Sequence, residues 1–81
     1  MNDKEWWDKA KPLIDEQVLE HSEQFSKEFI ILGTDLIEPQ CIAHEIYTID
    51  YMFENGWELI SVCKTSGMPK YMYFKRKKWH H

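Results

Sequence analysis

The first 25 residues show the most regular pattern of apolar and polar positions in the chain. Apolar residues and one histidine recur there at steps of three or four, which places them on one side of an α-helix. They are Trp7, Ala10, Ile14, Val18, His21 and Phe25, with Trp6 and Leu13 flanking them. Acidic residues occupy the other sides, so we predict an amphipathic helix with an acidic outer surface. Pro12 removes one amide donor, and we expect a kink or a break there.

A short apolar run follows over residues 28–32, and Gly33 ends it. An uninterrupted, partly β-branched run of this kind is typical of a strand that is covered on both faces or central in its sheet. We therefore expect such a strand here. Residues 34–38 have the composition of a loop, and Pro39 is placed to open the next element.

Helical spacing returns between Gln40 and Asn55. The apolar residues at that spacing are Ile42, Ile46, Ile49 and Phe53. We predict a helix with Gly56 as the left-handed residue that ends it, which would bring Trp57 onto Met52. The β-branched residues leave an alternative open, in which residues 41–47 form a strand and a two-turn helix begins at Thr48.

Residues 57–64 and 70–78 have strand-like composition, and a five-residue connection containing Gly67 joins them as a hairpin. The pattern as a whole predicts an α+β fold. An N-terminal amphipathic helix precedes a β-α-β-β unit with a small, mainly antiparallel three-stranded sheet. The helices cover one face of the sheet or lie one on each face.

Composition supports a single folded domain over residues 1–81, with a helical extension (1–25) and a core (27–78). The chain is 43% hydrophobic and 15% aromatic, with only 3 glycines and 3 prolines, which excludes a disordered or low-complexity chain. It has no run of roughly 20 apolar residues and no basic-then-apolar opening. We expect a cytoplasmic protein without a membrane partner, whose Cys41 and Cys63 are reduced, buried thiols.

The net charge of −4 conceals a division along the chain. Residues 1–54 carry 13 acids and 4 bases, whereas residues 55–81 carry 1 acid and 6 bases. The two parts are therefore net −9 and net +5, and the molecule should be strongly dipolar. Such a division steers charged partners or promotes self-association, or it keeps two faces solvated.

The core segment resembles the small bacterial and phage domains named DUF4177. The features that match are the leading strand over residues 29–32, the segment from Glu54 to Val62 with Gly56-Trp57-Glu58-Leu59 at its centre, and a last strand closing at residues 73–77. The resemblance implies a β-α-β-β fold and a bacterial or phage origin, with no catalytic residues to carry over. In size and charge the chain also looks like the small inhibitors that phages direct at host enzymes or defence proteins.

Few residues suit metal binding. Cys41 and His44 are three residues apart, and Cys63, His80 and His81 are further donors. Zinc sites usually show two tight pairs of ligands, and only one such pair is present. We predict no metal and no cofactor.

Catalytic motifs are also lacking in the sequence. The glycines at positions 33, 56 and 67 all fall in predicted turns, so no phosphate-binding loop or nucleophile elbow is formed. Cys63 alternates with Ser61 in a predicted strand, where a thiol is ordinarily a small apolar group. We therefore predict that the protein is not an enzyme.

Single-stranded nucleic-acid binding is the alternative function. Alternation along the last strand places aromatic and basic residues on one side of it, with Met72 and Phe74 on the other. The candidate residues are Tyr71, Tyr73, Lys75, Lys77 and Trp79. Aromatic rings stack on bases and lysines neutralise phosphates. The competing interpretation is that Tyr71 and Tyr73 pack beneath the N-terminal helix. The acidic residues also argue against this function, because they would repel a phosphate backbone.

Protein binding is the function we favour, and a homodimer is one form of it. Two adjacent tryptophans on a helix cannot both be buried against one flat sheet, and an exposed tryptophan is a frequent interface anchor. The candidate contact residues are Trp6, Trp7, Asp8, Asp15, Glu16, Leu19, Glu20 and Glu23. The acids either imitate nucleic acid toward a basic target or simply solvate the helix. We expect a non-catalytic module that inhibits a host enzyme or defence protein.

Overall fold

The computed structural model describes residues 3–24, 27–65 and 68–77. In chain order the elements are α1 (Asp3–Gln24), β1 (Phe29–Gly33), α2 (Ile42–Glu54), β2 (Trp57–Thr65) and β3 (Met68–Arg76). The fold is α+β, an N-terminal helix followed by β-α-β-β, as the sequence predicts. Residues 42–47 are helical, so the alternative strand over 41–47 is wrong. The predicted positions of Phe25 and Trp79 lie outside the described residues.

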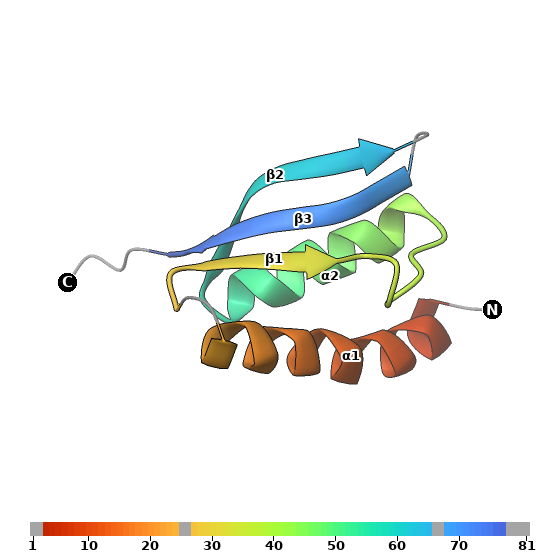
Figure 1. Cartoon of the computed structure of the whole chain (residues 1–81). Helices are drawn as coiled ribbons and strands as arrows, with labels where there is room; N and C mark the ends of the chain where they lie inside the picture. Colours follow the sequence, from red (N-terminus) through yellow and green to blue (C-terminus); the bar gives the residue numbers. More distant parts are fainter. Residues whose placement is uncertain (1–2, 25–26, 66–67, 78–81) are drawn as a thin grey trace.

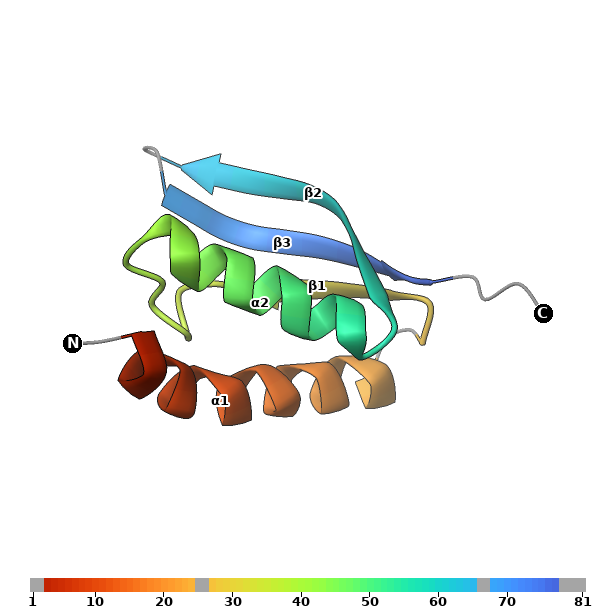
Figure 2. The same ribbon diagram turned by 180° about the vertical axis from the view of Figure 1, so that it is seen from behind.

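The three strands form an open sheet in the order β1-β3-β2. β3 lies in the middle and pairs antiparallel with both neighbours, with Ile31 opposite Tyr73 and Ser61 opposite Tyr73 on the other side. Both helices lie on the same face of the sheet, side by side (Figures 1 and 2). We call this the inner face, and the opposite one the outer face. Within the described residues, neither helix is long and apolar enough to cross a membrane.

Helix α1 runs through Pro12 as one element, so the predicted break does not occur. Pro12 is exposed, and the ring therefore points away from the sheet. The adjoining turns are held down because Ala10 and Ile14 are buried. Packing on both sides of the proline thus outweighs the loss of one helical hydrogen bond.

Strand β1 lies at an edge of the sheet and is open on one face, which corrects the expectation of a strand that is either covered on both faces or central. Its inner residues Ile30 and Leu32 are buried, whereas Phe29 and Ile31 on the outer face are 56% and 47% exposed. The chain returns through β3 between β1 and β2, so β1 has one neighbour. The side chain of Gln17 covers part of the free edge, because its Oε1 accepts a hydrogen bond from the Gly33 amide at 2.9 Å.

The core lies between the helices and the inner face of the sheet. Its buried apolar residues are Trp6, Ala10, Ile14, Ile30, Leu32, Ile37, Met52, Trp57, Met72 and Phe74. Gly56 ends α2 with a φ of 96°, as the sequence predicts, and its amide bonds to the carbonyl of Phe53 at 3.1 Å. This left-handed turn directs the chain from α2 into β2.

Candidate interaction surfaces

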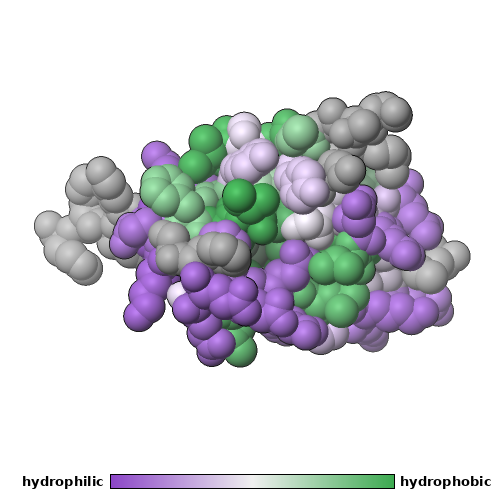
Figure 3. Space-filling view, in the orientation of Figure 1, coloured by the Kyte–Doolittle hydropathy of each residue, from purple (hydrophilic) through white to green (hydrophobic). Residues whose placement is uncertain are grey.

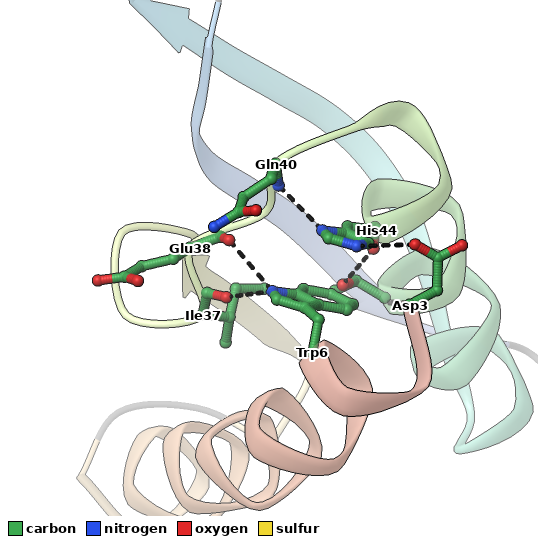
Figure 4. A network of polar contacts seen from close by, with 7 residues as sticks. Asp3, Trp6, Ile37, Glu38, Gln40 and His44 are labelled. Atoms are coloured by element: carbon green, nitrogen blue, oxygen red, sulfur yellow. Dashed lines mark hydrogen bonds and ion pairs between the residues drawn. The ribbon is translucent and has the colours of Figure 1, made fainter. Parts of the chain in front are cut away.

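Trp6 and His44 join α1 to α2 through a buried stack (Figure 4). Their ring centroids are 4.0 Å apart with parallel planes. The indole N–H of Trp6 donates to the carbonyl of Ile37 at 2.6 Å and also approaches that of Glu38 at 3.1 Å. Trp6 is only 3% exposed, so it is part of the core. This corrects its placement among the contact residues: the loop before α2 supplies the acceptors that let the indole be buried.

His44 makes a hydrogen bond through each ring nitrogen. Nδ1 accepts from the amide of Gln40 at 2.9 Å, and Nε2 faces Asp3 Oδ1 at 3.1 Å. Since Nδ1 faces a donor, the neutral ring carries its proton on Nε2 and donates it to Asp3. The orientation of His44 is therefore explained by its bonds to the backbone and to α1.

Donor atoms of Asp3, Cys41 and His44 lie within 4.8 Å of one another. A histidine that binds a metal through Nε2 normally donates its Nδ1 proton to an acceptor. Here Nδ1 accepts a hydrogen bond from the Gln40 amide, so the one N–H proton of the neutral ring is on Nε2. A metal could bind Nε2 only if that proton were lost. Because both ring nitrogens are engaged, His44 cannot serve Cys41 as a general base. Cys41 and Cys63 are both exposed, which corrects the expectation that they are buried. The geometry fits a structural link between the two helices.

The acidic residues of α1 point away from the sheet. Asp8, Asp15, Glu16, Glu20 and Glu23 are exposed, and Leu19 is 60% exposed among them. Trp7 is half-buried. Asp15 is hydrogen-bonded to α2, because the hydroxyl of Tyr51 donates to its Oδ1.

The outer face of the sheet is uncovered by either helix, so the tyrosines of β3 do not pack beneath α1. Tyr71 is 40% exposed, Tyr73 is half-buried and Lys75 is exposed. Figure 3 shows hydrophobic residues gathered over the strands on this face and hydrophilic ones along α1. The Nζ of Lys75 lies 3.8 Å from Oε2 of Glu58. The Nζ of Lys77 lies over the ring of Phe53, 3.6 Å from its centroid. The basic part of the predicted nucleic-acid face is thus partly engaged within the protein.

Three residues of the apolar stripe of α2, Ile42, Ile46 and Phe53, face solvent, although such a stripe ordinarily faces the core. Ile49, the fourth, is half-buried and packs against the core. The buried residues of α2 are instead His44, Thr48 and Met52. The stripe continues into a shallow groove shared with β2. We call the combined patch the α2–β2 surface. Its apolar residues are Ile42 (72% exposed), Ile46 (49%), Phe53 (51%), Leu59 (36%), Ile60 (52%) and the half-buried Ile49.

The polar residues of α2 can be buried because their bonds are made locally. The hydroxyl of Thr48 donates to the carbonyl of His44 at 2.9 Å, and His44 is satisfied by Gln40 and Asp3. A hydroxyl that donates to a carbonyl of the preceding helical turn can face the core, because its donor then has a hydrogen-bond partner. The spacing of apolar residues does not reveal the α2–β2 surface. The rotation of α2 depends on side-chain partners of His44 in α1 and in the loop before α2, and these are not visible in that spacing.

A second groove lies between α1 and α2, with a volume of about 510 Å³. Its walls are aromatic: Trp7 meets Tyr51 edge-on with centroids 5.2 Å apart, and Tyr47 with centroids 6.3 Å apart. We call it the aromatic groove. Its other lining residues are charged, namely Asp3, Lys4, Lys11, Asp50 and Glu54. Burial, followed by the hydrogen bond and charge of Asp15, raises the pKa of Tyr51 to about 12.

Comparisons of the chain with models of protein families, with curated proteins and with solved structures find no match. The function is therefore argued from the surfaces themselves, and the resemblance to DUF4177 stays a prediction.

Proposed function

We propose that this protein is a non-catalytic protein-protein interaction module and that the α2–β2 surface contacts the partner. The observation that carries the proposal is the solvent-facing stripe of α2, with Ile42 at 72% and Ile46 at 49% exposure. Soluble monomers rarely expose large contiguous apolar patches, and such patches commonly mark interfaces.

The surroundings of this surface also suit an interface. Glu58 and Lys75 line the groove beside Phe53, which gives an apolar centre with a charged rim. The acidic face of α1 lies on another side of the molecule and serves solubility and the steering of a charged partner.

The resemblance to DUF4177 implies a bacterial or phage source, so the partner we propose is a cytoplasmic protein of the bacterial host. Inhibition of that protein by occlusion is the mode of action we propose for so small a module. A second copy of the chain is the other protein partner, since an apolar patch that meets itself across a two-fold axis forms a closed dimer.

Two variants test which surface makes the contact. Ile46→Asp places a charge in the α2–β2 surface, while Leu19→Asp places the same charge on α1 at a comparably exposed leucine. Circular dichroism should show both variants folded. We expect Ile46→Asp to lose the captured partner, or the dimer seen by analytical ultracentrifugation, and Leu19→Asp to retain it. Loss in Leu19→Asp alone, or a strictly monomeric wild type that captures nothing, would contradict the proposal.

The open outer face supports single-stranded nucleic-acid binding as the second candidate function. Tyr71 and Tyr73 lie there without a helix above them, in position to stack on bases. In a fluorescence anisotropy titration with mixed-sequence oligonucleotides, this function requires binding that weakens steeply with salt and is lost in Tyr71→Ala. Binding that survives that substitution would exclude the outer face as the site.

A further inference from the structure

We infer that the aromatic groove is a binding site for the guanidinium group of an arginine side chain presented by a partner protein. The inference rests on the proposed function for the source of the arginine, although the site itself is tested without any partner. It concerns a different side of α2 from the apolar stripe.

The shape of the groove comes from both helices. Tyr47 and Tyr51 are one turn apart on α2, and Trp7 of α1 packs against the two of them. Trp7 and Tyr51 are half-buried and Tyr47 is 42% exposed. The rings are therefore held in place on one side and open on the other, which is the arrangement that allows a planar group to stack on them.

The groove already holds a cation over one of its rings. The ammonium of Lys11 lies 5.7 Å from the centroid of Tyr51, which is within the range of a cation–π contact. Lys11 is an exposed residue on a flexible side chain, so an incoming cation can displace it. The ring face of Tyr51 thus has the environment that a cationic ligand needs.

Acidic side chains line the same groove as the aromatic rings. Asp50 and Glu54 are exposed, lie one turn apart on α2 and line the groove. Guanidinium combines a flat face that stacks on aromatic rings with N–H groups that pair with carboxylates. An ammonium group has no such face and is more strongly hydrated, so the combination of rings and carboxylates favours arginine over lysine.

The groove adjoins the α2–β2 surface along the helix. Asp50 lies one turn beyond Ile46 and three residues before Phe53, and residues at these spacings are neighbours on a helix. A partner that covers the apolar stripe therefore passes the acidic rim of the groove. The net charge of −9 over residues 1–54 attracts a basic segment to this side of the chain.

The test is an NMR titration of the purified full chain with the peptide acetyl-Gly-Arg-Gly-amide. The indole N–H signal of Trp7 reports on the groove, and that of Trp6, which is buried and bonded to Ile37, is the internal control. We expect the Trp7 signal to move with a saturable dependence on peptide while the Trp6 signal stays in place. The citrulline peptide, which has the same shape without the charge, should bind at least about tenfold more weakly.

Variants separate the site from general attraction to an acidic protein. We expect Asp50→Asn and Glu54→Gln to weaken binding about threefold or more each, since each removes a pairing carboxylate. Glu16→Gln removes the same charge from the far side of α1 and should leave binding unchanged. Lys11→Gln should strengthen binding, because it removes the competing cation. Tyr47→Leu should weaken it.

Three results would overturn the inference: no movement of the Trp7 signal, equal movement with the arginine and citrulline peptides, or equal effects of Glu54→Gln and Glu16→Gln. If the titration is positive but the protein has no partner, the arginine site is supported and the proposed function is contradicted. If the titration is negative but a partner is captured through Ile46, the proposed function is supported and the arginine site is contradicted.

Discussion

The imidazole of His44 in α2 lies face to face with the indole of Trp6 in α1. His44 is also hydrogen-bonded to Asp3 of α1, which is 41 residues away in the sequence. The stack fixes the start of α1 against the start of α2. Its polar edges are bonded to the loop that connects β1 to α2. The rotation of α2, and with it the exposure of its apolar stripe, is set largely at this junction.

Replacing Trp6 with phenylalanine should show the importance of the indole hydrogen bonds. Trp6→Phe keeps a ring on His44 but leaves the buried carbonyl of Ile37 without its donor. We expect the free energy of unfolding, measured in urea, to fall by about 1–3 kcal/mol. Trp7→Phe, at a half-buried position, should lower it by less than about 1 kcal/mol. Equal effects of the two substitutions would contradict the assignment of Trp6 to the core.

The rotation of α2 is tested by comparing two neighbouring positions. Met52 is 1% exposed and Phe53 is 51% exposed. We expect Met52→Ala to lower the free energy of unfolding by about 2–5 kcal/mol and Phe53→Ala by less than about 1 kcal/mol. The reverse order in a chemical denaturation experiment would mean that the apolar stripe faces the core.

Tyr51 should ionise later than an ordinary tyrosine. Burial and Asp15 raise its pKa from 10.0 to about 12, so between these values the unfolded chain loses a proton that the folded chain keeps. Stability from this group is fully present below pH 10 and is lost as the pH rises toward 12. The measurement is the absorbance of tyrosinate at 295 nm, taken as the difference between the protein and Tyr51→Phe.

Asp15→Asn should lower the pKa of Tyr51 only part of the way toward 10, because burial is the larger cause. Asp8→Asn removes an exposed acid of the same helix and should leave the titration of Tyr51 where it was. An unchanged titration in Asp15→Asn would contradict the hydrogen bond between the two helices.

The tautomer of His44 tests whether its site is structural. We expect long-range proton–nitrogen NMR spectra to show the proton on Nε2, because Nδ1 accepts from the amide of Gln40. With that tautomer in place, a chelator should not change the melting temperature, and zinc should not shift the His44 signals. A proton on Nδ1, together with stabilisation by zinc, would make Asp3, Cys41 and His44 a metal site instead.

Periodicity predicted the order and type of the elements well, because each is specified locally. Trp7, Ala10 and Ile14 share one side of a helix whatever surrounds it, and Gly56 marks the end of α2 through its own backbone preference. The sequence could not show which strand lies between the others. Ile30 and Ile31 have the same apolar character, yet Ile30 is 1% and Ile31 is 47% exposed. The reason is that both helices lie on the inner face of the sheet and neither covers Ile31 (Figures 1 and 2).

The proposed contact surface is harder to predict than the fold. Apolar spacing cannot distinguish a stripe that faces the core from one that faces a partner, and in α2 the core side carries His44 and Thr48. Burial of these polar groups depends on partners in α1 and in the loop before α2. The sequence makes both Trp6 and Trp7 candidate contacts. Trp6 is the buried one because its indole N–H has acceptors at Ile37 and Glu38 and its ring stacks on His44.

The most direct measurement of the central claim is site-specific photo-crosslinking of the full chain in bacterial cells. A benzophenone amino acid is placed at Ile46 of the α2–β2 surface and, as the matched control, at Leu19 of α1. We expect a discrete covalent adduct, with another protein or with a second copy, from position 46 and none from position 19. Adducts from position 19 alone, or from neither position, would contradict the assignment of the α2–β2 surface as the interface.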